Sequence, residues 1–130
     1  MRGLDTNVLV RLFTRDDPSQ ASAADAFIAD CAENRDQIFV AMPVFCELVW
    51  VLRSEGFPRS QIAECVEALL TRQIFRIDRE NLVRMALDRY RNGKGDFADY
   101  LIGAIAEDAG CRDTVSFDRD LKGAPGFTIL

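Results

Sequence analysis

The sequence predicts an α/β protein, a three-layer sandwich in which a central, mostly parallel sheet of four to five strands is flanked by helices. Short apolar runs alternate with longer amphipathic stretches, and two helical stretches often separate successive strands. Alternation of this kind implies a parallel sheet covered on both faces. No repeat, linker or low-complexity stretch interrupts the 130 residues, so we expect a single domain over residues 1–130.

Turn and capping residues divide the first half of the chain into elements. Proline opens helices well, because its ring fixes φ and the first turn needs no N–H partner. Pro18 and Pro43 stand at such positions, and Gly56 closes the helix that Pro43 begins. We expect a buried strand that ends at Asp5, a helix from Val8, a helix at 18–35, a strand at 38–41, and helices at 43–54 and 58–70.

The second half continues the alternation. Apolar residues at three-and-four spacing predict a helix at 79–91, which stops at the polar and glycine-rich residues 92–95. Asp96 then opens the last long helix. The remaining expected elements are strands at 75–77, 114–117 and 127–130 and the helix at 96–110.

The sequence contains no histidine. Its absence excludes the commonest general base, the serine–histidine and cysteine–histidine nucleophile systems, and histidine-ligated zinc, iron or copper. Catalysis therefore has only carboxylates, hydroxyls and cations to use. Sites built from carboxylates alone suit hard, oxygen-seeking ions such as Mg²⁺ or Mn²⁺.

The net charge and the cysteines limit the binding partners and the cellular compartment that the sequence predicts. The net charge of −5 argues against broad, non-specific nucleic-acid binding through a cationic surface. Arginine makes up most of the basic residues, which suits bidentate contacts with phosphate or carboxylate, although a GC-rich genome gives the same bias. The four cysteines lie in apolar, helix-like sequence, as buried free thiols of a reducing cytosol do. No apolar run predicts a leader or a membrane span, so we expect a cytoplasmic protein that makes no membrane contact.

Asp5 is the first candidate for a functional site. It stands where a buried strand is expected to end, and the crevice beyond the strand ends is where sites form in open α/β sheets. The alternative is an ordinary helix start, since Asp5, Thr6 and Asn7 are all good N-caps. Asp5 becomes a convincing site residue only if acids from elsewhere in the chain lie beside it.

Glu47 is the second candidate. It is the only charge in residues 44–52, a stretch that is apolar nearly all round, so we expect it to be buried. A buried carboxylate must be neutralised, hydrogen-bonded or bound to a cation. A buried pair with an arginine such as Arg11, or a place on the exposed stripe of the helix, is the alternative.

Three further acids complete the set. Asp99 shares a helix face with small and apolar residues and is expected to point inward. Asp96 stands at an N-cap position, and Asp118 follows a strand, so capping and a strand-end turn are their alternatives. We expect Asp5, Glu47, Asp99 and Asp118 to converge on one sheet edge, where Mg²⁺ would relieve their mutual repulsion and hold a substrate phosphate.

Four motifs in this order carry a family resemblance: residues 3–9, Glu47, residues 96–102 and residues 114–118. Through them the chain resembles the PIN-domain nucleases, and within these the VapC-type toxins of bacterial toxin–antitoxin pairs, over essentially its whole length. The resemblance implies a PIN-like nuclease domain and an Mg²⁺- or Mn²⁺-dependent endoribonuclease that hydrolyses RNA with metal-activated water.

The resemblance also implies roles for individual residues. The implied acidic quartet is Asp5, Glu47, Asp99 and Asp118, with Asp5, Asp99 and Asp118 as metal ligands. Thr6 and Ser116 match positions where the family carries hydroxyls near the metal, and Asp96 is an auxiliary acid. The family usually has threonine where this chain has Ser116, and Asp120 is an alternative to Asp118.

A VapC-type toxin implies a cognate, VapB-like antitoxin that holds the enzyme in check. Lys94, Arg89 and Arg91 are candidates for contacts with the RNA backbone, with solvated helix surface as the alternative. Apolar helix residues, including Trp50 and Phe57, are candidates for an antitoxin groove or a homodimer contact, with core packing as the alternative.

Two other functions stay open on the sequence. A PIN-like interaction module without turnover is one, and the intact acidic quartet speaks against it. An aspartyl-phosphate phosphatase or receiver that uses Asp5 as nucleophile is the other. Such a phosphatase would normally have a second acid at position 7, where Asn7 stands, and a receiver needs further acids at the first strand end.

Overall fold

The computed structural model describes all 130 residues, which form six α-helices, one 3-10 helix and five strands. Two compact units make up the chain, Met1–Asp78 and Arg79–Leu130. Every strand pairing is parallel, and helices separate the strands along the chain, so the predicted α/β class is confirmed. The expected single sheet of four to five strands is not formed, because β1, β2 and β3 pair with one another and β4 pairs only with β5. None of the helices combines the length and the apolar character that crossing a lipid bilayer demands.

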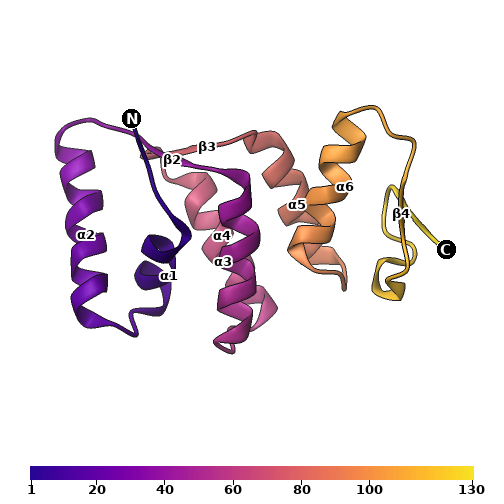
Figure 1. Cartoon of the computed structure of the whole chain (residues 1–130), viewed down its shortest axis with the longest axis horizontal. Coiled ribbons are helices and arrows are strands. Elements are labelled where there is room, and N and C mark those ends of the chain that lie inside the picture. Colours follow the sequence, from indigo (N-terminus) through magenta and orange to yellow (C-terminus); the bar gives the residue numbers. More distant parts are fainter. The chain divides into compact units, whose positions relative to one another are not determined.

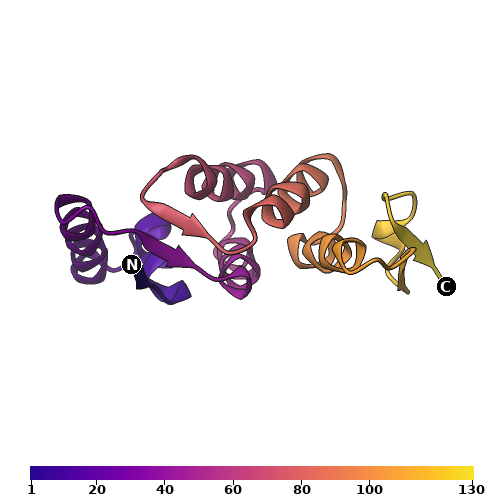
Figure 2. The same cartoon turned by 90° about the horizontal axis from the view of Figure 1, so that it is seen from above.

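The first unit is a three-stranded parallel sheet with four helices. Its elements are β1 (Arg2–Gly3), α1 (Thr6–Thr14), α2 (Pro18–Glu33), β2 (Ile38–Val40), α3 (Met42–Ser54), α4 (Arg59–Thr71) and β3 (Phe75–Ile77). The strand order is β1-β2-β3, and β2 and β3 lie next to each other in Figure 2. Ile38 and Val40 are fully buried in the central strand, as the apolar run predicted. Helix α1 packs against both α2 and α3, between which it lies in Figure 1.

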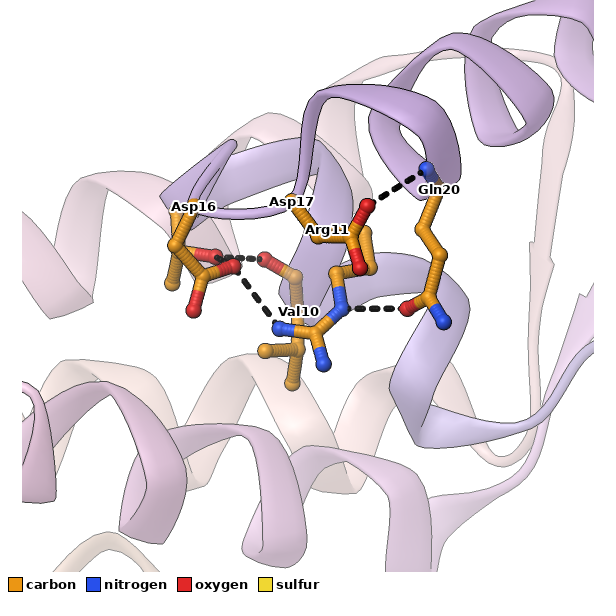
Figure 3. Close-up of polar contacts among 6 residues, drawn as sticks. Val10, Arg11, Asp16, Asp17 and Gln20 are labelled. Atoms are coloured by element: carbon orange, nitrogen blue, oxygen red, sulfur yellow. Dashed lines mark hydrogen bonds and ion pairs between the residues drawn. The ribbon is translucent and has the colours of Figure 1, made fainter.

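A polar network holds the turn between α1 and α2 (Figure 3). Arg11 donates from Nε to Gln20 Oε1 at 2.6 Å and from Nη1 to Asp16 Oδ1 at 2.7 Å. Asp17 caps α2 by accepting a hydrogen bond from the backbone N–H of Gln20 at 3.0 Å. The guanidinium of Arg11 binds residues of this turn, so the alternative in which Arg11 pairs with Glu47 is wrong.

The second unit contains two packed helices and a two-stranded parallel sheet. Its elements are α5 (Glu80–Asn92), α6 (Phe97–Asp108), β4 (Thr114–Ser116), the 3-10 helix η1 (Arg119–Leu121) and β5 (Phe127–Ile129). Helices α5 and α6 lie side by side, and the rings of Tyr90 and Phe97 meet edge to face with centroids 5.9 Å apart. Strand β5 reaches α6 through the edge-to-face pair of Tyr100 and Phe127.

Glycine is required in the loop between α5 and α6. A Cβ on Gly93 would lie 2.0 Å from the Tyr100 hydroxyl, and a Cβ on Gly95 would lie 2.4 Å from a methyl group of Leu121. The hydroxyl of Tyr100 also accepts a hydrogen bond from the backbone N–H of Gly95 at 2.9 Å. The buried Tyr100 thus fixes the loop that carries Lys94 and leads directly to Asp96.

All predicted helices and strands are present, with ends that agree within two residues. The prediction of four buried thiols holds only in part. All four cysteines are free, and Cys31 and Cys65 are buried, but Cys46 is half-buried and Cys111 is exposed. Cys111 lies outside the helix pattern, because α6 ends at Asp108 and the chain then turns towards β4.

Candidate active site

Asp5 lies between β1 and α1, as the strand-end prediction required. The expectation that this strand is buried is wrong, because β1 is the edge strand of its sheet and both of its residues are exposed. It is the N-cap of α1, and its Oδ1 accepts a hydrogen bond from the backbone N–H of Thr6 at 2.8 Å. The capping alternative is therefore confirmed, and the side chain is also exposed. A carboxylate has lone pairs beyond the one used in capping, so the cap leaves Asp5 free to bind a cation as well.

Thr6 connects Asp5 to Glu47. It is 4% exposed and the only buried residue of polar or charged type. Its Oγ1 donates a hydrogen bond to Glu47 Oε2 at 3.1 Å, which joins the first turn of α1 to α3. A buried hydroxyl needs such a partner to offset its desolvation. The contact therefore holds Glu47 beside the residue that follows Asp5.

The expectation that Glu47 is buried is wrong. Helix α3 turns Phe45, Leu48 and Leu52 into the core, each with no exposed area. Glu47 lies on the opposite, exposed stripe with Trp50, which is 69% exposed. An exposed carboxylate needs no neutralising partner, so its candidacy rests on the Thr6 contact and on its availability to a cation.

Asp96 and Asp99 begin α6 together. The backbone N–H of Asp96 donates to Asp99 Oδ2 at 3.1 Å in a capping-box arrangement. Asp99 is half-buried, in agreement with its predicted inward face. Burial raises the pKa of Asp99 above its usual range, and the nearby charges of Asp96 and Asp118 raise it further, against the opposing effect of the Asp96 hydrogen bond.

Asp118 follows β4 and begins the 3-10 helix. Its Oδ1 accepts from the backbone N–H of Asp120 at 2.9 Å, and its own N–H donates to Ser116 Oγ at 3.0 Å. Asp118 contributes to the electrostatic field at Asp99, whereas Asp120 lines a separate cavity. Within this unit the geometry favours Asp118 over Asp120 as the acid that acts with Asp99.

The structure thus gathers the candidate residues in two sets. Asp5, Thr6 and Glu47 lie in the first unit, and Asp96, Asp99, Asp118 and Ser116 lie in the second. No group of three or more histidine, cysteine, aspartate or glutamate side chains lies close enough to hold a metal ion. The expectation that four acids share one site stays a prediction.

The candidate RNA-contacting cations lie on or next to α5. Arg89 is half-buried and pairs through Nη2 with Glu107 Oε2 at 2.8 Å, while Arg91 and Lys94 are exposed. Arg89 and Lys94 line a cavity of about 650 Å³ with two cations that sequence reasoning missed, Arg119 and Lys122. A signal was available in the sequence. The only lysines of the chain are Lys94 and Lys122, and each is adjacent to glycine.

The apolar residues expected at an interface differ in their surroundings. The alternative that Trp50 packs in the core is wrong, because its side chain is exposed, whereas Phe57 is half-buried. A cavity of about 460 Å³ lies between α1 and α2, with Val8 and Phe27 in its wall, and neither Trp50 nor Phe57 lines it. The antitoxin groove at Trp50 and Phe57 stays a prediction.

Comparison with known proteins defines the class first. The PIN domain family matches residues 4–126, so the chain belongs to this family. The chain is also similar to a VapC ribonuclease of Aquifex aeolicus (strain VF5), to which it is 29% identical over 123 residues, or 94% of this chain and 90% of that protein. The resemblance drawn from the four motifs, including its VapC-type branch, is thereby confirmed.

Proposed function

We propose that the protein is a metal-dependent endoribonuclease that hydrolyses RNA phosphodiester bonds. The observation that carries the proposal is the half-buried Asp99, which lies in the field of Asp96 and Asp118 in a chain that belongs to the PIN domain family. Acids arranged so that they oppose one another's ionisation are typical of sites that bind a cation. The similarity to a VapC ribonuclease supports RNA as the substrate.

The chemistry of the candidate ligands fits Mg²⁺ or Mn²⁺. The proposed metal ligands are Asp5, Asp99 and Asp118, which offer only carboxylate oxygens, the donors that these hard ions prefer. Burial raises the pKa of Asp99, the charges of Asp96 and Asp118 raise it further, and a bound cation would offset both effects. A divalent ion supplies a water of lowered pKa and neutralises charge on the phosphate.

The protein's own residues orient the acids. The Asp96 N–H fixes one oxygen of Asp99, and the Thr6 hydroxyl fixes one oxygen of Glu47, so each carboxylate keeps a defined direction before substrate arrives. We assign Glu47 the role of orienting the attacking water and accepting its proton. Ser116, which accepts the Asp118 N–H, and Asp96 are assigned positioning roles.

We also propose that the enzyme is a VapC-type toxin of the cytoplasm, held in check by a VapB-like antitoxin and present as a homodimer. The family match and the similarity to a VapC ribonuclease support the toxin role. Expression of the unmutated protein without a partner is expected to arrest growth. Normal growth with abundant, folded protein would contradict the toxin role and leave the nuclease activity to be judged separately.

Hydrolysis by metal-activated water makes a specific prediction about the RNA ends. The purified protein should leave 5′-phosphate and 3′-hydroxyl ends, because water and not the RNA's own 2′-hydroxyl attacks phosphorus. Excess EDTA should abolish cleavage, and Mg²⁺ or Mn²⁺ should restore it. Mass spectrometry of the fragments identifies the ends. Recovery of 2′,3′-cyclic phosphate, or cleavage that persists in EDTA, would overturn the mechanism.

The same assay separates the other candidate functions. An interaction module without turnover cleaves no RNA under any metal condition. A protein that forms an aspartyl phosphate on Asp5 would incorporate phosphate from a small phosphodonor, which a metal-dependent nuclease does not do.

A further inference from the structure

The cavity of about 650 Å³ in the second unit lies outside the proposed catalytic acids. It is bounded by the end of α5, the loop that carries Lys94 and the segment from η1 towards β5. Four cations line it, Arg89, Lys94, Arg119 and Lys122, against two acids, Asp88 and Asp120. Asp96, Asp99 and Asp118 do not line it. The cavity therefore has an excess of positive charge in a chain whose net charge is −5.

Most of these cations have no partner within the protein. Lys94, Arg119 and Lys122 are exposed and make no ion pair. Arg89 is the exception, but only its Nη2 is used, by Glu107. Its Nη1 is buried without a hydrogen-bond partner, and buried donors of this kind normally have an acceptor. The three exposed, unpaired cations on one cavity indicate an anionic ligand, whereas the buried Nη1 of Arg89 is not accessible to one.

We propose that this cavity binds a phosphate of single-stranded RNA other than the phosphate that is cleaved. The inference rests on the proposed ribonuclease function and adds a second contact to it. Cations from three segments can donate to the several oxygens of one phosphate, and guanidinium groups do so in bidentate fashion. Lys94 lies two residues before Asp96, and Arg119 directly follows Asp118, so an RNA strand bound at these acids has the cavity within reach.

The mixture of cations and acids in the cavity favours short contacts to one phosphate over a general electrostatic attraction for RNA. Asp88 and Asp120 stand among the four cations, which limits long-range attraction and leaves short, directional contacts to decide binding. Such contacts set the position of the strand without reading the bases. The cavity thus places the RNA for cleavage and leaves the choice of sequence to other residues.

Salt-dependent RNA binding tests the proposal. The probe is a labelled single-stranded RNA of about ten nucleotides, a length within the range that proteins bind as one site. It is followed by fluorescence anisotropy in EDTA at several KCl concentrations. Arg119→Ala and Lys122→Ala should each weaken binding about three- to tenfold and reduce the slope of log K against log salt by about 0.7. Lys122→Arg should keep the wild-type slope. Arg112→Ala, which removes an exposed cation of the same unit outside this cavity, is the matched control and should change little.

The outcomes are distinct. Wild-type slopes in both alanine variants, or no RNA binding by the wild type, would overturn the inference. Unlabelled RNA, an acidic peptide and inorganic phosphate are compared as competitors of the labelled RNA. Displacement by the peptide or by phosphate at a tenth of the concentration that unlabelled RNA requires would also overturn the inference, because the cavity would then bind a different anion. Cleavage assays on the same proteins in Mg²⁺ separate this inference from the proposed ribonuclease function. Slope changes without any Mg²⁺-dependent cleavage contradict only the proposed function, and cleavage without slope changes contradicts only this inference.

Discussion

Asp99→Asn is expected to lower RNA cleavage in Mg²⁺ by at least about 10³-fold, the scale on which groups that organise transition-state charge contribute. The asparagine oxygen can still accept the Asp96 N–H, so the start of α6 is preserved while the charge proposed to hold the ion is lost. Single-turnover cleavage of a defined RNA measures the effect. Asp5→Asn should behave in the same way, because its amide oxygen can still cap α1.

A matched control exists for the acid that follows β4. Asp118→Asn should lose activity on the same scale, whereas Asp120→Asn, two residues further on, should retain most of it, because Asp120 faces the cationic cavity. Asp88→Asn on α5 controls for the loss of one negative charge from the same cavity. Full activity of Asp99→Asn and Asp118→Asn, with all variants folded, would remove both residues from the site.

Asp99→Asn in metal-free buffer at pH 7 is expected to melt at or above the wild-type temperature, against the usual trend of substitutions. The pKa of Asp99 is raised in the folded protein, so the folded state binds the proton more tightly than the unfolded state does. Its ionisation therefore costs stability as the pH rises from the unfolded pKa through the folded pKa. Asparagine has no such cost. The stability of the wild type should accordingly rise relative to the variant as the pH falls through this window.

Metal should reverse the order of the two proteins. Mg²⁺ at about 100 times its dissociation constant should stabilise the wild type by about 2.7 kcal/mol, through selective binding to the folded state. The variant should gain much less. Thermal unfolding with and without Mg²⁺ measures both effects. A variant that melts well below the wild type without metal, yet keeps its full Mg²⁺ shift, would show that Asp99 serves only as a cap.

Local signals in the sequence predict most of the architecture. Pro18 and Pro43 each lie in the first two positions of a helix, and Asp96 caps the helix that it was expected to open. The run 75–77 forms β3 with the bounds that its apolar pattern predicts. These signals act within a few residues along the chain, so no knowledge of distant contacts is needed to read them.

Features that depend on tertiary contacts were predicted less well. The stretch 44–52 is so apolar that its periodicity does not mark the exposed side. The pattern therefore predicts a buried Glu47, whereas Glu47 lies with Trp50 on the surface. The Thr6 hydrogen bond to Glu47 joins residues 41 positions apart, beyond any local pattern. Arg119 and Lys122 join Lys94 only because η1 folds back beside the loop after α5.

Direct titration with Mn²⁺, followed by electron paramagnetic resonance of the free ion, tests most directly whether the carboxylates bind a divalent metal. The wild type is expected to bind Mn²⁺ with Mg²⁺ as competitor, and Asp5→Asn, Asp99→Asn and Asp118→Asn should each weaken binding at least about tenfold. Asp120→Asn and Asp88→Asn should bind as the wild type does. Equal Mn²⁺ affinity in all of these proteins, or no binding by the folded wild type, would contradict the account.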